Sequence, residues 1–219
     1  MENKVELIGW YGGDEAIACS AWTSTSRNLT EEKRGRMGKL IKDLWSADPV
    51  PHGSPFEKGI VHFLVDSDIA SHIHLLKHRI SSINAESARY KELKEDKTYI
   101  PRDWMQIQIK ENGPNKHTWA EMLEAINNIS NKWYHQAIEE LTPILGKKRA
   151  KESARYFKTY SSQIESDVMF NMRSFHNFLT QRMDNHAQLE IQTISKEMLR
   201  LVKEIPGNPF KYTIEAWNM

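Results

Sequence analysis

Cysteine is nearly absent from this sequence: among 219 residues there is one, Cys19. A single thiol excludes an internal disulfide and any cysteine-based metal cluster within one chain. Long apolar runs are also missing, because no stretch approaches the roughly 20 residues that cross a membrane as a helix. The first residues, MENKVELIGW, carry charges where the apolar core of a signal peptide would lie. We therefore expect a cytoplasmic protein with no membrane partner.

An excess of charge of either sign is missing too. Thirty lysines and arginines oppose 29 aspartates and glutamates, which leaves a formal charge of +1. We therefore expect no nucleic-acid polymer as a partner, and a locally built site for any anion that the chain binds. No strand-to-helix turn carries a GxGxxG or P-loop pattern, which excludes the two common glycine-rich phosphate loops.

What is present is an ordinary globular composition, 39% hydrophobic and 27% charged. The length suits one large domain, and we find no internal repeat or low-complexity segment. We therefore predict a single domain over residues 1–219.

Alternating apolar residues predict three strands. A short strand is expected at Val5–Trp10, and Val61, Phe63 and Val65 share one face of a second strand. The clearest alternation is MQIQIK at Met105–Lys110, where the apolar side chains would point inward.

Capping residues and helical periodicity predict the helices. Thr30 opens one helix, and Thr118 with Glu121 forms a capping box before a long helix that ends near Pro143 and Gly146.

Three further helices follow from apolar spacing. Ile69, Ile73, Leu76 and Ile80 recur at intervals of 4, 3 and 4 residues, and two later helices are expected at Asp167–Arg182 and Asn185–Glu204. Long helices mixed with a few non-adjacent strands favour an α+β fold.

The segment KHRISSINAESARY, Lys77–Tyr90, concentrates hydrogen-bond donors at the end of the Ile69–Ile80 pattern. If the helix continued, Lys77, His78 and Arg79 would fan across more than half of its circumference, with Lys77 aimed near the core. One interpretation is a solvated basic helix end, which the helix dipole favours. The other is a local anion site.

A second constellation lies at Asn171, Phe175, Phe178 and Arg182, spaced 4, 3 and 4, with His186 four residues later. A charge on a buried face is costly unless it is paired. The pair could be internal, from Arg182 to Asp184 or Glu190, or an anionic ligand could complete it. Likewise, Arg155 could pair with Glu152 along a helix or contact a ligand.

Metal and nucleophile chemistry are poorly supported. His72 and His74 stand two residues apart, but no third ligand follows at a useful spacing, so we expect no metal site. Ser87 by itself does not define a Ser–His–acid arrangement.

The donor-rich segment resembles the signature of flavin-dependent thymidylate synthases, Arg-His-Arg-x-x-Ser-x-Asn-x-x-Ser-x-Arg-Tyr. All fixed positions match except the first, which is Lys77. Three more regions agree in order and spacing: HGSPFE at His52–Glu57, KESAR at Lys151–Arg155, and FNMRSFHNFLTQRMDNHAQLEIQ at Phe170–Gln192. The resemblance covers at least residues 52–192.

The resemblance implies a homotetramer of α+β subunits, each with a mixed or antiparallel sheet flanked by long helices, and active sites at subunit interfaces. FAD would be bound without a Rossmann fold, which agrees with the missing glycine loop. NADPH would reduce the flavin, and the one-carbon unit of methylenetetrahydrofolate would pass to C5 of dUMP, giving dTMP and tetrahydrofolate. No cysteine attacks the pyrimidine in this family.

The resemblance also implies roles for individual residues. The positions that match cofactor-binding residues of the family are Ser54, Lys77, His78, Arg79, Asn171, Arg173, Asn177 and His186, the last orienting folate and flavin. The positions expected at the nucleotide are His74, Glu86, Ser87, Ala88, Arg89, Arg155 and Arg182. Arg182 matches the arginine that favours ionisation at N3 of the pyrimidine, and a cation at that developing charge activates C5 without a covalent adduct.

The sequence departs from the family pattern at three positions near the expected nucleotide and flavin. Lys77 replaces arginine and loses its forked donors, His74 replaces a common glutamine, and Ala85 replaces a frequent glutamate. Three alternatives to thymidylate synthesis therefore stay open: a dUMP or dCMP hydroxymethylase, a dCMP methylase, and a non-catalytic nucleotide-binding protein.

Overall fold

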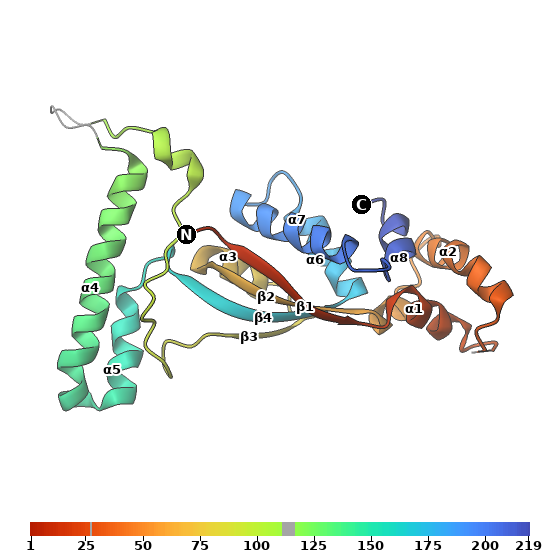
Figure 1. Ribbon diagram of the computed structural model, residues 1–219, viewed down its shortest axis with the longest axis horizontal. Coiled ribbons are helices and arrows are strands. Elements are labelled where there is room, and N and C mark those ends of the chain that lie inside the picture. Colours follow the sequence, from red (N-terminus) through yellow and green to blue (C-terminus); the bar gives the residue numbers. More distant parts are fainter. Residues whose placement is uncertain (27, 111–116) are drawn as a thin grey trace. The chain divides into compact units, whose positions relative to one another are not determined.

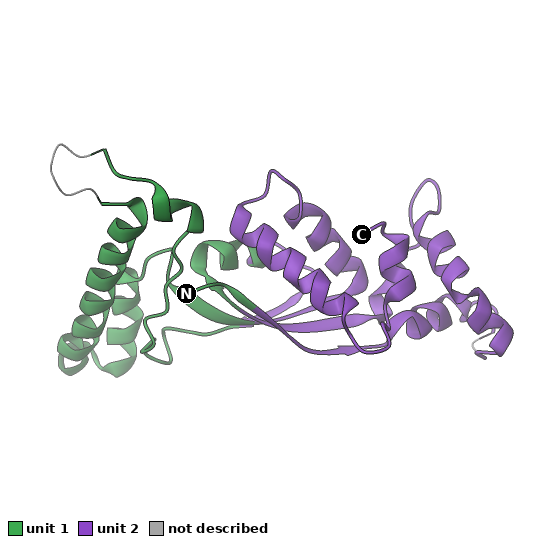
Figure 2. Ribbon diagram, turned by 45° about the horizontal axis from the view of Figure 1, so that its top comes forward, with its two compact units in different colours: residues 1–4, 66–75, 85–166 green, residues 5–65, 76–84, 167–219 purple. Residues whose placement is uncertain are grey.

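The computed structural model describes residues 1–26, 28–110 and 117–219. They form two compact units (Figure 2): residues 1–4, 66–75 and 85–166 make up unit 1, and residues 5–65, 76–84 and 167–219 make up unit 2. The single domain expected over residues 1–219 stays a prediction, since a compact unit is not by itself an independently folding domain. Within the described ranges, no helix combines the length and the apolar character needed to cross a membrane.

A small antiparallel sheet of four strands confirms the α+β class. Its order is β1-β2-β4-β3, and the strands are β1 (Lys4–Tyr11), β2 (Ile60–Asp68), β3 (Ser82–Ala85) and β4 (Gln163–Asn171). The two strands expected near residues 5 and 61 are both present. The side chains of Val61, Phe63 and Val65 are fully buried, as their alternation predicts.

Unit 2 is built around packed aromatic side chains. Phe175 and Phe178 of α6 (Met172–Arg182) are fully buried, and their ring centroids lie 5.8 and 5.1 Å from that of Phe170 on β4. Phe63 of β2 lies 5.7 Å from Phe175. The apolar middle of the predicted stripe therefore anchors α6 to the sheet. Around it lie α1 (Gly13–Trp22), α2 (Glu31–Trp45), the 3-10 helix η1 (Ser54–Lys58), α7 (Leu189–Lys203) and α8 (Lys211–Ala216).

Unit 1 contains a helical hairpin, visible in Figure 1, in which α4 (Trp119–Leu145) packs along α5 (Lys147–Ala154). The predicted capping box is confirmed at Thr118 and Glu121. Tyr134, Ile138 and Ala154 form the buried cluster between the two helices. The unit also holds most of α3 (Ile69–Leu76) and the 3-10 helices η2 (Arg102–Gln106) and η3 (Arg155–Phe157).

Three expectations about the elements are wrong. The helix expected to run to Ile80 ends at Leu76, and Ile80 is 75% exposed, so Lys77 is a surface residue rather than one aimed at the core. Asp167–Asn171 belongs to β4, where buried Val168 and Phe170 alternate with less buried neighbours. The strand expected at Met105–Lys110 is absent: η2 ends at Gln106, and only one bridge, from Gln108 to Thr118, follows. Two of the three alternating apolar side chains there, Met105 and Ile107, are exposed, and Ile109 is half-buried.

Candidate functional site

A cavity of about 490 Å³ in unit 2 gathers most of the residues that the sequence analysis assigns to the cofactor. Its lining includes six of those eight: Lys77, His78, Arg79, Asn171, Arg173 and Asn177. Glu57, Ile80, Ser174 and Gln181 complete it, and none of these four was predicted to bind a ligand. The volume falls in the range of small-molecule sites, about 300–1,000 Å³.

The N-terminus of α6 forms one wall of this cavity. Asn171 is the N-cap, and its side-chain oxygen accepts a hydrogen bond from the backbone N–H of Ser174 at 2.9 Å. Because the cap uses the oxygen, the amide nitrogen of Asn171 is the group it offers to a ligand. Arg173 and Asn177 follow one helical turn apart on the same lining. A helix N-terminus favours anions, so this wall suits a phosphate-bearing ligand.

The charge of the cavity points the same way. Lys77, Arg79 and Arg173 oppose one carboxylate, that of Glu57, which accepts from Nη1 of Arg173 at 2.8 Å. Gly53 makes room for this arrangement, since a Cβ at that position would lie 2.7 Å from Nε of Arg173. The lining therefore keeps an excess of positive charge for an anionic ligand.

Arg182 and His78 contact each other directly. Nε of Arg182 donates to Nε2 of His78 at 2.9 Å, so the ring accepts at Nε2 and carries its proton on Nδ1. His78 is 7% exposed, and its ring lies edge-on to Phe178 with centroids 5.0 Å apart. Burial lowers the pKa of the Arg182 guanidinium from its usual value. The predicted catalytic arginine is thus held by His78, which lines this cavity.

Two of the predicted cofactor residues lie outside the cavity lining. Ser54 begins η1 directly after Gly53 and is exposed. His186 is also exposed, and Asp184 accepts from both its backbone N–H and its Nδ1 at 2.8 Å. Asp184, which the sequence analysis considered as a partner for Arg182, is therefore engaged by His186.

The other predicted nucleotide residues lie in unit 1. Both Nε and Nη2 of Arg89 donate to Oε1 of Glu152, at 2.9 and 2.8 Å. This pair lowers the pKa of Glu152 and raises that of Arg89. Glu152 is thus engaged by Arg89, 63 residues away in sequence, while Arg155 follows at the exposed end of α5.

Residues 86–90, which include four of the positions expected at the nucleotide, are held in place by several hydrogen bonds and an ion pair. The backbone N–H of Glu86 donates to the carbonyl of Glu165 at 2.8 Å, and the Glu86 carboxylate pairs with Lys91. Ser87 accepts from the backbone N–H of Tyr90 at 3.0 Å, which turns the chain after Ala88. His74 lies half-buried in α3.

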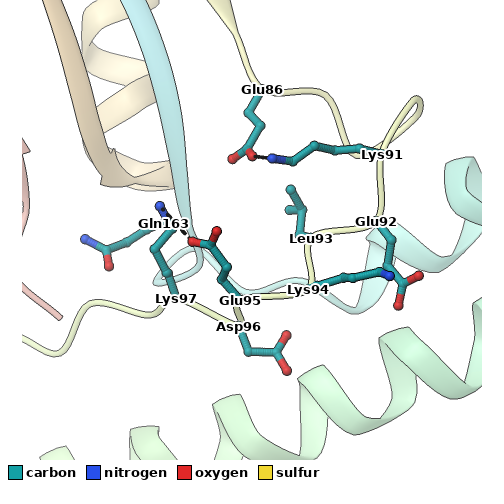
Figure 3. Close-up of a pocket in the computed structure, with 9 residues that line it drawn as sticks. All are labelled: Glu86, Lys91, Glu92, Leu93, Lys94, Glu95, Asp96, Lys97 and Gln163. Carbon is teal, nitrogen blue, oxygen red and sulfur yellow. Dashed lines mark ion pairs between the residues drawn. The ribbon is translucent and has the colours of Figure 1, made fainter.

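Residues 86–97, called here segment 86–97, are anchored to α4 by contacts that the sequence analysis missed. His135 contacts Glu92 through Nδ1 at 2.6 Å and Asp96 through Nε2 at 3.0 Å. Lys158 donates to Asp96 at 3.0 Å. Figure 3 shows this segment bordering a cavity of about 250 Å³ lined by Glu86, Lys91, Glu92, Leu93, Lys94, Glu95, Asp96, Lys97 and Gln163. The segment that carries the predicted nucleotide residues is thus held by His135 of α4 and by Lys158, which directly follows η3.

Histidine pairs give no metal centre among residues 1–26, 28–110 and 117–219, where no group of three His, Cys, Asp or Glu side chains could hold an ion. Nδ1 of His72 bonds to Oγ of buried Ser166 at 2.8 Å, and burial lowers the pKa of His72. His72 is therefore part of the interior packing of unit 1.

Comparisons with known proteins identify the family. Residues 6–206 match the family model described as thymidylate synthase complementing protein. The chain is 31% identical over 201 residues to the flavin-dependent thymidylate synthase of Pseudothermotoga lettingae, covering 92% of this chain and 85% of that protein. It is 33% identical over 219 residues to that of Thermosipho africanus, covering 93% and 90%. A crystal structure of the UMP/dUMP methylase PolB from Streptomyces cacaoi, bound with 5-Br dUMP, superposes with a TM-score of 0.73 at 26% identity, covering 99% and 95% of the chains. The chain therefore belongs to the flavin-dependent thymidylate synthase family.

Proposed function

We propose that this enzyme transfers the one-carbon unit of methylenetetrahydrofolate to C5 of dUMP with reducing equivalents from NADPH, giving dTMP and tetrahydrofolate. The observation that carries the proposal is the convergence of six expected cofactor residues on one cationic cavity at the N-terminus of α6. The proposed functional assembly is a homotetramer, because the family resemblance implies active sites at subunit interfaces.

FAD is the proposed occupant of the cavity in unit 2. Its pyrophosphate suits a lining that carries Lys77, Arg79 and Arg173 beside a helix N-terminus. The amide of Asn171 and that of Asn177 would orient the cofactor by hydrogen bonds. When bound, FAD supplies the redox chemistry that carries the one-carbon unit to the nucleotide.

Arg182 is the proposed catalytic residue. His78 holds its guanidinium through Nε, which leaves the two terminal nitrogens as planar donors for the edge of a pyrimidine. A cation there stabilises negative charge as N3 ionises, and C5 becomes more nucleophilic. This role favours a uracil ring over a cytosine ring, since N3 of cytosine carries no proton to lose.

Arg89, Arg155, Ser87 and the backbone around Glu86–Ala88 are proposed to bind the nucleotide phosphate. In the structure Arg89 is held by Glu152, so a phosphate would share or replace that carboxylate as the partner of the guanidinium. The crystal structure of PolB with 5-Br dUMP supports a nucleotide as the substrate, because the two chains align over almost their whole length.

UMP is a second candidate acceptor, because the structurally similar PolB is a UMP/dUMP methylase. The departures at Lys77, His74 and Ala85 add altered products, such as a 5-hydroxymethyl nucleotide, to the outcomes to be tested.

The test uses the purified flavin-loaded protein with NADPH and methylenetetrahydrofolate, to which dUMP, UMP or dCMP is added. Mass spectrometry of the nucleotide should show a methyl group added to dUMP. Turnover of dCMP alone, or a 5-hydroxymethyl product from dUMP, would contradict the proposed reaction. Purified protein that shows no flavin absorbance after incubation with FAD and removal of the free cofactor would contradict the assignment of the cavity.

A further inference from the structure

A polar face of α6 forms a long wall of the cofactor cavity in unit 2. Arg173, Asn177 and Gln181 recur every four residues and all line the cavity, which places them on one face of the helix. From Arg173 to Gln181 this wall is about 12 Å long, given a rise of about 1.5 Å per residue. Phe175 and Phe178 on the other side of the helix are fully buried, so they hold the polar face toward the cavity.

One hydrogen bond determines which polar atoms the far end of this wall presents. Nε2 of Gln181 donates to Oδ1 of Asn177 at 3.1 Å. A primary amide has two N–H donors and one acceptor oxygen, so Gln181 keeps one N–H and its oxygen. Within the part of the chain that the structure describes, that oxygen accepts no hydrogen bond. Gln181 thus presents a donor and an acceptor side by side.

The charged groups of the lining differ from Gln181 in what they can bind. Lys77, Arg79 and Arg173 only donate, and the carboxylate of Glu57 is already engaged by Arg173 at 2.8 Å. A pyrophosphate, which only accepts, suits these cations. The oxygen of Gln181 pairs instead with an N–H or O–H group. The part of the cofactor beside Gln181 is therefore one that both donates and accepts.

The neighbouring Arg182 indicates which part of FAD this is. Arg182 directly follows Gln181 and donates to His78, which also lines the cavity. In the proposed reaction Arg182 faces the pyrimidine, and the flavin ring must lie close to that pyrimidine for the one-carbon unit to pass between them. The ring therefore belongs at the Gln181 end of the wall and the pyrophosphate at the Arg173 end.

The flavin ring has an edge that matches a primary amide. This edge carries an N–H between two carbonyl groups, and an amide pairs with adjacent donor and acceptor atoms through two hydrogen bonds, as glutamine does with adenine. Reduction of the ring adds negative charge that its carbonyl oxygens share, and hydrogen bonds to a charged acceptor are stronger than those to a neutral one. A donor at this edge therefore stabilises the reduced ring more than the oxidised ring.

We propose that the amide of Gln181 binds the carbonyl and N–H edge of the flavin ring and raises the reduction potential of the cofactor. The inference rests on the proposed function, which assigns FAD to this cavity, and it adds a residue to which the family resemblance gives no role. The alternative is a structural role in which the bond to Asn177 only stabilises α6, as amide pairs at this spacing do in helices.

The midpoint potential of the bound flavin distinguishes the two roles. Gln181→Leu removes the amide and should weaken the binding of reduced FAD about tenfold more than that of oxidised FAD, which lowers the two-electron potential by about 30 mV. Gln181→Glu replaces the remaining N–H donor by a negative charge and should lower the potential further. Spectroelectrochemical titration of the flavin-loaded protein measures both variants, and the Glu variant decides the question if the Leu variant does not fold.

Gln136→Leu is the matched control. Nε2 of Gln136 on α4 donates to Glu140 at 2.8 Å over the same four-residue spacing, but this pair belongs to unit 1. The control should keep the wild-type potential, and an equal fall in it would overturn the proposal.

An unchanged potential in Gln181→Leu would also overturn the proposal, even if FAD binding became weaker. A structural role, or a contact with the adenine of FAD, would weaken the oxidised and reduced forms alike. A potential of Gln181→Glu at or above that of wild type would be equally contradictory. Wild-type protein that binds no flavin would defeat the proposed function together with this inference, whereas bound flavin with an unchanged potential would defeat this inference alone.

Discussion

His135 is predicted to control how well the enzyme binds its nucleotide, although it lies outside the proposed phosphate contacts. Both of its ring nitrogens face carboxylates, those of Glu92 and Asp96, and carboxylates only accept. The ring lies between these two carboxylates and ties segment 86–97 to α4. The change His135→Ala removes both contacts while Lys158 keeps its bond to Asp96.

The size of the effect follows from exposure. A hydrogen bond to a charged group contributes about 1.5–3 kcal/mol when buried, and the His135 side chain is 31% exposed. We take about 1 kcal/mol for each contact, or about 2 kcal/mol of lost anchoring. If this loss makes the binding-competent conformation of segment 86–97 the minor one, the apparent affinity for dUMP falls in proportion to the population of that conformation. The KM for dUMP should then rise about 10- to 30-fold.

Steady-state kinetics with varied dUMP measure this effect. The kcat at saturating dUMP should stay within about threefold of wild type, and flavin absorbance should be unchanged because the cofactor cavity belongs to unit 2. His135→Lys, which places a hydrogen-bond donor between Glu92 and Asp96, should recover much of the KM, and Lys132→Ala on the exposed side of α4 is the control. An unchanged KM, or a loss of flavin, would refute the reasoning.

Three further predictions concern other parts of the molecule. Arg182→Ala should reduce turnover at least 100-fold while flavin stays bound, because it removes the cation proposed at N3; normal turnover, measured as dTMP formed, would exclude that role. Burial raises the pKa of Asp14 to about 6 from 3.8, so the folded state binds this proton more tightly than the unfolded state. The free energy of unfolding should therefore fall by roughly 3 kcal/mol as the pH rises from about 4 to about 6 and should not change further from this group above that range; urea unfolding should show that this part of the pH dependence is missing from Asp14→Asn, and an identical profile would contradict the assignment. Gly53→Ala should weaken FAD binding by the apoprotein about tenfold, because the new methyl group displaces Arg173; fluorescence titration with FAD measures this, and an unchanged affinity would show that Arg173 does not contact the cofactor.

Local signals in the sequence predicted the elements that depend on local physics. The capping box at Thr118, the N-cap at Thr30 and the alternation around Phe63 each act within a few residues, and all three are confirmed. The same rules failed where contacts between segments distant in sequence determine the secondary structure. β3 has only four residues, SINA, and carries no strong strand signal of its own, so it forms because β4 lies beside it. The alternation at Met105–Lys110 is real, but Met105 and Ile107 are exposed, so it marks no buried strand face.

The candidate site shows the same division. The family motifs named six residues that the structure places around one cavity, since a motif records side chains that a fold brings together. The pairing of Arg89 with Glu152 and that of His135 with Glu92 could not be predicted. These partners lie 63 and 43 residues apart, and no periodicity links them. On α4, the side chains of Met122, Ile126, Ile129 and Trp133 recur at helical spacing and are exposed, because a helical pattern identifies an apolar face but not what covers it.

The direct passage from β4 into α6 has a consequence for how this protein tolerates change. The strand ends at Asn171 and the helix begins at Met172, so no loop separates them. One residue inserted or deleted there would turn the whole of α6 by about 100° about its axis. Arg173 and Asn177 would swing away from the cofactor wall, and Arg182 would leave His78. Length variation that surface loops absorb without harm should therefore be lethal to catalysis at this junction.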